Sequence, residues 1–294
     1  MRRSAIALSF VVACSAGAWG ASGCGASASA PLSVETIELP KLPESSIKAE
    51  KTLFIAGETM SFDVSLRGVL GARAVVAVGE PGYVDGKATI VVRSQVASAG
   101  IVAAIREVRD DIESWIELDK GLVVSHLANS TFGKKSSHVV SDLGGGMPGP
   151  FVLEYTRKGK AMVKIRQKLP KNANVFDIHA ILGVLRAWNS DEGDETHFFL
   201  LSGRRLWRSS LRVGVRETIK TRMGRYPVIR IDGVAQRVSR GLADIKKMKP
   251  RNFSVWLSDD ADRLPLLIMA TTEYGDLRVE MTEYTRPDRR ITSR

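Results

Sequence analysis

The feature that most constrains the fold is a period-two alternation of apolar and polar residues, which recurs in one segment after another. In the first such segment Met60, Phe62, Val64 and Leu66 are separated by polar or charged residues. Because successive side chains of a strand point to opposite faces, this spacing predicts strands with one buried face. Short turn sequences such as Ser202-Gly203 join neighbouring segments into hairpins. The pattern therefore predicts a mainly β fold, a curved antiparallel sheet or an open half-barrel.

Helical spacing of apolar residues is found in only two segments. Residues 175–188 carry Ile178 and Ile181 on one face, and Asp177 is placed to cap the first turn or to lie in it. Residues 100–108 form a shorter candidate. We therefore expect one or two helices inserted in the sheet, with the 175–188 helix packed over one mouth or face of it.

Residues 1–23 have the composition of a secretory signal peptide. A basic start is followed by an apolar run and then by small residues, the order of regions that a signal peptidase substrate shows. A retained transmembrane helix is the alternative reading, because the run is long enough to span a bilayer. Its second half is mostly Gly, Ala and Ser, which contribute little transfer free energy in lipid. The sequence therefore predicts cleavage and export.

Three cleavage sites remain open. Ala21-Ser22-Gly23-Cys24 resembles a lipobox, in which the cysteine is diacylated and becomes the new N-terminus, although Leu is more usual than Ala21 at that place. Cys14 also follows a lipobox-like sequence but leaves a short signal, and ordinary cleavage could occur at Ala26-Ser27-Ala28. We predict lipidation of Cys24, which would anchor the protein firmly to a membrane.

The remaining chain divides into three parts. Residues 24–50 are rich in proline and small residues, which predicts a lipidated cysteine and a flexible tether. Residues 51–285 form a single β-rich domain, and residues 286–294 form a basic tail. Both cysteines of the chain lie within the first 24 residues. A domain that lacks cysteine has no disulfide and must be held by packing alone.

The charge of the chain is strongly positive, at +11, and it is clustered. Residues 157–171 contain seven basic residues and no acidic one. A solvated basic face that keeps the protein soluble is one interpretation. The other is attraction to an anionic component of the envelope, such as phospholipid headgroups, lipopolysaccharide phosphates or an acidic polymer. Nucleic acid is not expected as a partner, because aromatic residues are not interleaved with the basic runs.

Local motifs give no support for a cofactor or a metal. Residues 144–149 match G-x-G-x-x-G, but Pro148 prevents the helix that a dinucleotide site needs. Residues 82–87 imitate a phosphate-binding loop and are one residue short. The histidines show no metal-ligand spacing; they are His126, His138, His179 and His197.

The sequence WLSDDADRLP at residues 256–265 concentrates three carboxylates and an arginine between two apolar runs. A calcium loop would need alternating ligands, a glycine and a distant glutamate, which are missing here. Asp residues bond their own backbone in turns, and proline restricts the residue before it, so we predict a structural turn. Arg263 can pair across the loop, and its contribution would be larger if its guanidinium reached both Asp259 and Asp260 and covered the ring of Trp256. The predicted turn motif is Trp256, Asp259, Asp260, Arg263 and Pro265.

Segments 58–66, 108–122, 176–188, 256–268 and 275–284 carry motifs in a fixed order along the chain. In this order they resemble the bacterial domain-of-unknown-function family numbered 3108, which consists of exported proteins. The most specific mark is the acidic, arginine and proline element that follows Trp256, and Ser114-Trp115 is the next. The resemblance implies an envelope protein and no particular reaction, because none is established for the family.

These observations favour a non-catalytic lipoprotein of the cell envelope of a Gram-negative-type bacterium, in the outer membrane or periplasm. It would contact the membrane through its lipid anchor and either bind an apolar or lipid ligand or dock on an envelope partner. One alternative is an exported hydrolase that uses Asp110, Asp111 and Glu113, although these acids also suit a charged strand edge. A polyanion-binding module is the other alternative. The oligomeric state does not follow from the sequence.

Overall fold

The computed structural model describes residues 52–143, 151–169, 173–245, 248–272 and 274–292. The predicted signal peptide, Cys14, Cys24, the tether and the glycine-rich segment 144–149 therefore lie outside the described residues. In the ranges that are described, no helix is both long and apolar enough to cross a membrane.

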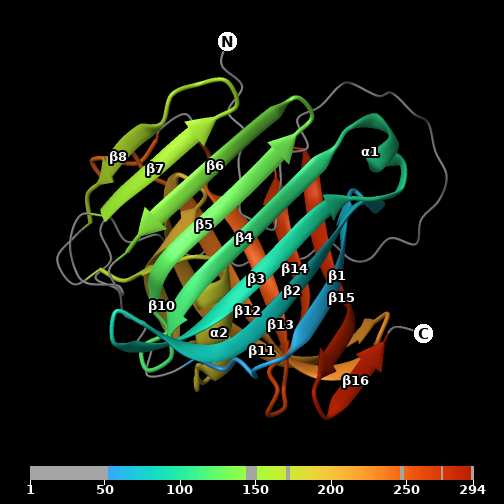
Figure 1. The fold of residues 1–294 in the computed structure, drawn as a ribbon. Coiled ribbons are helices and arrows are strands. Elements are labelled where there is room, and N and C mark those ends of the chain that lie inside the picture. Colours follow the sequence, from blue (N-terminus) through green and yellow to red (C-terminus); the bar gives the residue numbers. More distant parts are fainter. Residues whose placement is uncertain (1–51, 144–150, 170–172, 246–247, 273, 293–294) are drawn as a thin grey trace.

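The described chain folds into sixteen strands and two helices (Figure 1). The strands of the first half are β1 (Thr59–Leu66), β2 (Val69–Val84), β3 (Lys87–Ser98), β4 (Val108–Glu117), β5 (Val123–Phe132), β6 (Lys135–Asp142), β7 (Phe151–Arg157) and β8 (Val163–Gln167). Those of the second half are β9 (Val175–Phe176), β10 (Glu195–Ser202), β11 (Arg205–Thr221), β12 (Gly224–Arg237), β13 (Arg251–Ser258), β14 (Pro265–Thr272), β15 (Gly275–Arg286) and β16 (Arg289–Thr292). The helices are α1 (Gly100–Ile105) and α2 (Ile178–Ala187).

All strands belong to one sheet with the order β8-β7-β6-β5-β4-β3-β2-β1-β15-β14-β13-β12-β11-β10-β9, and β16 pairs with β15 beside this path. Strand β1 pairs with both β2 and β15, so it joins two meanders that run away from it in opposite directions. The two edge strands, β8 and β9, are not paired with each other. Figure 1 shows the sheet curving into a front wall and a back wall. The prediction of a curved, mainly antiparallel, open sheet is confirmed.

The concave side of the sheet holds the core and α2. Alternate residues of β1 and β15, including Met60, Phe62 and Met281, are buried there as the period-two pattern predicts. Helix α2 is buried along its length rather than lying over an outer face. A Cβ atom on Gly183 would lie 2.3 Å from the ring of Phe54, so only glycine lets the chain before β1 pack this closely on the helix.

Both predicted helices form, but each is shorter than predicted. Asp177 is the N-cap of α2, and its Oδ1 accepts a hydrogen bond of 2.9 Å from the N–H of Ala180. Val175 and Phe176, expected in the helix, instead form β9, because these β-branched and aromatic residues pair in parallel with β10. Helix α1 stops at Ile105, since Val108 already begins β4.

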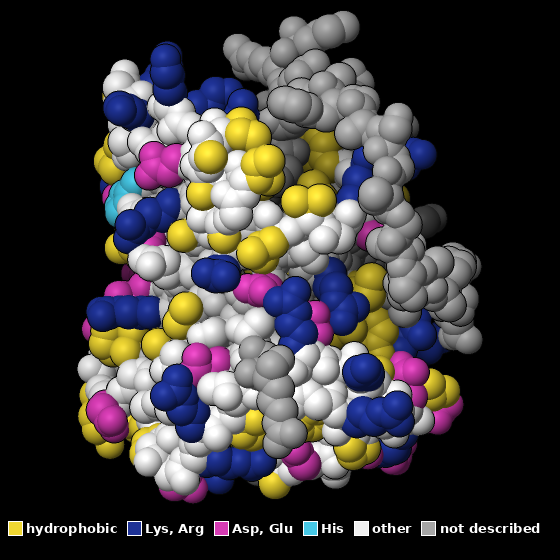
Figure 2. Space-filling model, turned by 90° about the vertical axis from the view of Figure 1, so that its right-hand side faces the viewer, with side chains coloured by type: hydrophobic (Ala, Val, Ile, Leu, Met, Phe, Trp, Pro, Cys, Tyr) yellow, Lys and Arg dark blue, Asp and Glu magenta, His cyan; other side chains and the backbone are white. Residues whose placement is uncertain are grey.

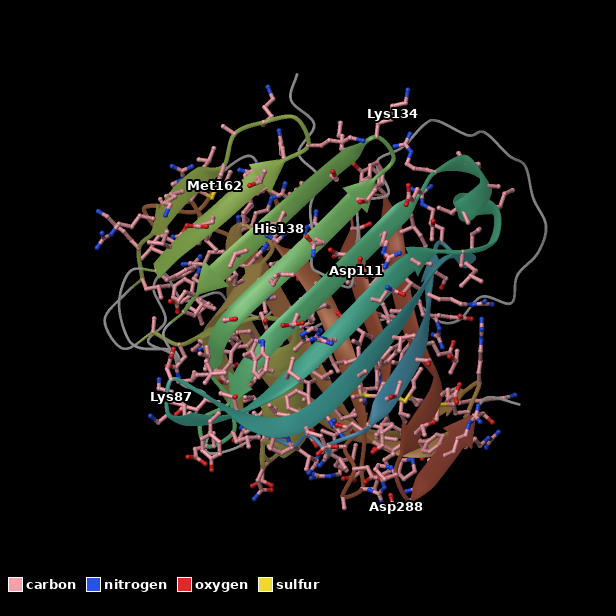
Figure 3. The ribbon with its side chains drawn as sticks, viewed as in Figure 1. Lys87, Asp111, Lys134, His138, Met162 and Asp288 are labelled. Atoms are coloured by element: carbon pink, nitrogen blue, oxygen red, sulfur yellow. The ribbon has the colours of Figure 1, made fainter. Side chains whose placement is uncertain are left out.

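The last described residues of the chain are part of the sheet. Residues 286–294 were expected as a basic tail, and within them Arg289–Thr292 forms β16, which pairs with Glu283–Arg286 of β15. Asp288 marks the turn between the two strands in Figure 3. The sheet is thus extended by a short hairpin whose arginines can reach neighbouring acids.

Candidate functional site

The first group of polar side chains gathers at the N-terminal end of α2. It consists of Ser94 on β3, Ser114 on β4, His126 on β5, and Asp177 and His179 from the helix. His126 Nδ1 lies 2.8 Å from Asp177 Oδ2, and the hydroxyl of Ser114 donates to the same oxygen. His179 Nδ1 lies 2.7 Å from Ser114 Oγ, and its Nε2 lies 2.8 Å from Ser94 Oγ. This group joins α2 to three strands of the front wall.

One arrangement of protons satisfies these contacts. Burial lowers the pKa of His179 to about 4, so its imidazole is neutral at neutral pH and can donate from Nδ1 while accepting from Ser94 at Nε2. Burial alone would raise the pKa of Asp177, but the hydrogen bond and attraction of His126 and the N–H of Ala180 hold it at about 2. The Asp177 carboxylate therefore stays ionised and accepts hydrogen bonds from both Ser114 and His126.

Serine, histidine and aspartate occur together here, yet the geometry is not that of a hydrolase triad. In such a triad the histidine takes the serine proton and the carboxylate orients the histidine. Here the Ser114 hydroxyl donates to Asp177 itself, and every member of the group is buried, so a substrate cannot reach it. The arrangement acts as a structural tie between α2 and the sheet.

A second buried group fixes the other end of α2. Arg186 donates from Nη1 and Nη2 to the two carboxylate oxygens of Glu58, over 2.6 and 3.0 Å, and also donates to the backbone oxygen of Asp262 over 3.2 and 3.1 Å. The hydroxyl of Tyr284 donates to Glu58 over 3.0 Å. Burial, together with the charge of Glu58, raises the pKa of Tyr284 to about 12. This ion pair is fully buried and has several supporting hydrogen bonds.

The sequence 256–265 contains the connection between β13 and β14. Asp260 Oδ1 accepts from the hydroxyl of Ser258 over 2.7 Å and from the N–H groups of Asp262 and Arg263 over 3.0 and 3.1 Å. Leu264 N–H donates to Ser258 Oγ over 2.7 Å. These bonds replace the strand ladder at the turn, and they are the self-bonding that aspartate provides in turns.

Two contacts considered for Arg263 are made by other arginines. Arg230, on the neighbouring β12, lies with its guanidinium 5.6 Å from the ring centre of Trp256. Asp259 pairs with Arg216 over 3.3 Å. Arg263 adopts a left-handed backbone with φ of 47°, and its backbone N–H, not its guanidinium, is what donates to Asp260.

Asp262 plays a part that the sequence did not reveal. It is the one acid of this stretch that the predicted turn motif does not include, and its side chain is almost completely buried. Its two carboxylate oxygens accept from Arg286 over 2.7 Å and from Arg289 over 3.0 Å. Because its backbone oxygen also binds Arg186, the turn connects α2 to the β15–β16 hairpin.

The acids proposed for a hydrolase are separated by the pleat of β4. Asp110 faces the core, where burial raises its pKa to about 6 against the effect of a 2.6 Å hydrogen bond from Ser130. Asp111 lies on the convex face, as Figure 3 shows, and binds Gln95 and Arg109. Glu113 shares that face and pairs with Arg93 over 2.7 Å. These residues therefore do not form one site. Across the described ranges, no group of three or more His, Cys, Asp and Glu side chains is placed to hold a metal ion.

A third group of polar residues lies at the opposite end of the concave side, and we call it the arginine cluster. It is formed by Arg204, Arg205, Arg237 and Arg251. Arg205 precedes Trp207 by two residues on β11, Arg237 pairs with Trp207 in register, and the guanidinium of Arg251 lies 5.6 Å from the centre of the Trp207 ring. These side chains therefore share the inner face of the back wall.

The front wall meets the arginine cluster at Tyr155 on β7. The guanidinium of Arg204 lies 4.6 Å from the centre of this ring, and that of Arg157 lies 5.7 Å from it. Tyr155 lies near the end of β7, beside the β5–β6 hairpin that carries Lys134 in Figure 3. The cluster thus occupies the end of the molecule away from α2.

The arginine cluster is electrostatically unfavourable in itself. Burial, followed by the charges of Arg237 and Arg204, lowers the pKa of Arg205 to about 10. Burial and Arg204 also lower the pKa of Arg237. Among the described residues no carboxylate forms an ion pair with any of these three arginines. The cluster is not evident from the sequence, because its members come from hairpins that only the strand register brings together.

The fold and these sites define a class of protein, an open β-barrel-like sheet that holds a helix on its concave side. The chain belongs to DUF3108, a family of proteins of unknown function whose model matches residues 61–282. This confirms the resemblance drawn from the sequence motifs. No curated protein matches the chain.

The chain was also compared with solved structures, of which the first below has a similar fold. A β-barrel-like protein of the domain of unknown function DUF1849 from Brucella abortus is 10% identical, with a TM-score of 0.50, and the match covers 79% of this chain and 98% of that one. A protein of Bacteroides fragilis described as exported, with a YmcC-like fold, is 9% identical with a TM-score of 0.39, over 81% of this chain and 100% of that one. At such identities the likeness concerns the fold alone.

Proposed function

We propose that this protein is a non-catalytic lipoprotein of the bacterial cell envelope that binds a lipid or another apolar ligand at the open side of its sheet. The observation that carries the proposal is an exposed apolar position on the inner face of the edge strand. Val163 of β8 pairs in register with Tyr155, so it shares the inner face, and 49% of it is exposed. An acyl chain could enter beside it, because no strand in the described part of the chain pairs with the outer edge of β8.

The chemistry of the buried polar groups favours binding over catalysis. The Ser–His–Asp group and the Glu58–Arg186 pair are buried, and apart from His126 Nε2 their polar side-chain atoms are hydrogen-bonded within the protein. Asp111 and Glu113 are paired on the outer face, so the hydrolase alternative has no common site to support it. Docking on an envelope protein, the other form of the proposal, is tested by the same experiment.

The predicted anchor places the domain in the envelope. Leader residues 1–23 and Cys24 support export and lipidation, with outer membrane or periplasm as the compartment. Labelling with palmitate should be lost in Cys24→Ala. Unchanged labelling in that variant would favour Cys14, and absence of labelling in the parent would favour ordinary secretion.

The ligand proposal is tested by extracting the full-length protein, purified from its host, and identifying bound lipids by mass spectrometry. We expect a stoichiometric lipid, and we expect Val163→Asp to lose most of it because the carboxylate would face the acyl chain. Val215→Asp is the matched control, since Val215 is 48% exposed and lies on β11 away from this edge. Lipid-free protein that captures an envelope protein would favour docking, and equal lipid in both variants would contradict the proposed entry.

A further inference from the structure

The arginine cluster contrasts with the arginines of the outer surface. On the side of the molecule where β1, β15 and β16 lie, dark-blue and magenta side chains sit next to one another (Figure 2). There Asp63 pairs with Arg73 and Arg222, and Glu280 pairs with Arg278 and Arg222. In the described ranges the fold therefore supplies carboxylates to arginines on its surface but none to Arg204, Arg205 or Arg237.

Two buried hydrogen-bond donors, one in the arginine cluster and one on the tryptophan beside it, lack acceptors. Arg205 Nη1 and Trp207 Nε1 are both inaccessible to solvent and have no hydrogen-bond partner among the described residues. A buried N–H without an acceptor is costly, and most such groups in native proteins are satisfied by protein, water or ligand. Both atoms belong to the inner face of β11, two residues apart. The cluster thus combines excess positive charge with donors that need an acceptor.

We propose that the arginine cluster binds a phosphate group, with Arg205 and Trp207 donating to its oxygens and Arg204 and Arg237 balancing its charge. The planar fork of a guanidinium matches the oxygens of phosphate, and a cluster of cations suits a group that carries more than one negative charge. This inference rests on the proposed function, because a phosphate at this end would be the headgroup of the lipid whose chain passes Val163.

The position of the cluster supports an amphiphilic ligand. Tyr155 is in contact with Arg204 and is the register partner of Val163, so the basic and apolar parts of the site are adjacent. Phosphate has two sources, a lipid headgroup or a soluble phosphate compound, and both present the same oxygens to the cluster. The experiment must separate them.

The test uses the full-length protein and measures binding by calorimetry and by the shift in melting temperature. Inorganic phosphate is one probe, and vesicles of phosphatidylcholine with or without phosphatidylglycerol are the other. We expect Arg205→Gln and Arg237→Gln to weaken binding at least about tenfold, the loss typical of a charge-assisted hydrogen bond. Arg222→Gln is the matched control, because it removes an arginine that already has carboxylate partners.

Each outcome has a distinct meaning. Vesicle binding that depends on phosphatidylglycerol and is competed by phosphate supports the headgroup, whereas phosphate binding without vesicle binding supports a soluble compound. Equal affinities in the parent, Arg205→Gln and Arg237→Gln overturn the inference. If the purified protein still carries lipid in that case, the proposed function stands and only the headgroup site is wrong. If no lipid is found but the arginine-dependent phosphate affinity remains, the phosphate site stands and the lipid function fails.

Discussion

The two ends of the concave side use charged residues in opposite ways. At the α2 end, Arg186 meets Glu58 in a bidentate pair, and His126 meets Asp177. At the other end, Arg204, Arg205 and Arg237 crowd together with no described carboxylate between them. The same sheet thus encloses one region whose polar groups are almost completely satisfied and another in which charge and donors are in excess.

The difference separates charged residues that hold the fold together from charged residues that are available to bind a ligand. Buried charges that have partners hold elements in place, and removing one partner leaves the other uncompensated. Charges that lack protein partners destabilise the free protein and are useful only when a ligand supplies the counter-charge. One exception at the α2 end is His126 Nε2, which is buried without an acceptor or donor among the described residues. Variants at the two ends should therefore change stability in opposite directions.

The largest effect is expected at the ion pair of α2. Glu58→Gln leaves the Arg186 guanidinium buried without a counter-charge and weakens the hydrogen bond that residue 58 accepts from Tyr284, so the free energy of unfolding should fall by about 3–5 kcal/mol. Urea denaturation followed by circular dichroism measures this. The control is Glu195→Gln, which removes the partner of Arg212 on the surface and should cost less than about 1 kcal/mol. Equal losses in the two variants would show that the α2 pair does not hold the fold.

A smaller effect concerns acid stability, where two buried groups, His179 and Asp110, oppose each other. The pKa of His179 is lowered to about 4, so the unfolded state binds its proton first and stability falls as pH drops from about 6.5 to 4. The pKa of Asp110 is raised to about 6, so its protonation favours the native state over the range from about 6 down to 4. The two contributions partly cancel in the parent.

Asp110→Asn removes the stabilising protonation of Asp110. We expect its melting temperature to drop more steeply than that of the parent between about pH 6 and 4, because the destabilising protonation of His179 is no longer opposed by the protonation of Asp110. Thermal denaturation at several pH values provides the measurement. Asp111→Asn is the matched control, because Asp111 lies on the convex face. Burial acts to raise the pKa of Asp111, but the hydrogen bonds from Arg109 and Gln95 to its carboxylate outweigh that effect and lower the pKa. Parallel pH profiles for the parent and Asp110→Asn would contradict the assignment.

The sheet could be predicted from the sequence because its signal is local. Alternation within β1 gives the buried face, and the 175–188 periodicity gives α2 with Asp177 as its cap. The partners of α2 could not be predicted in this way. Glu58 and Arg186 are 128 residues apart, and their contact depends on how the chain before β1 crosses the helix. A sign was present, since Arg186 follows Leu182 by four residues and so lies on the apolar stripe.

The arginine cluster was missed for a related reason. The density of basic residues along the chain is high in residues 157–171, and the members of the cluster lie outside that run. The cluster depends on register instead, because Arg237 reaches Arg205 only through the β11–β12 pairing. The available signal was alternation itself, as Arg205, Trp207 and Leu211 fall on one face and Arg205 is a charge at an inward position. A charge at such a position points to a partner or a ligand.

The smallest expected effect is a gain in stability at the arginine end. Arg205→Gln removes a half-buried charge that Arg204 and Arg237 repel, so the free protein should become more stable by about 1 kcal/mol, after allowance for partial exposure. Melting temperature in buffer without phosphate measures this gain. Arg208→Gln is the control on the same strand, because Arg208 pairs with Asp244 over 2.9 Å and its loss should destabilise. A gain in stability together with a loss of phosphate affinity is what a binding site gives, since the same repulsion that costs the free protein is relieved when the anion binds. A loss of stability in Arg205→Gln would instead make this arginine part of the framework, as Arg186 is at the other end.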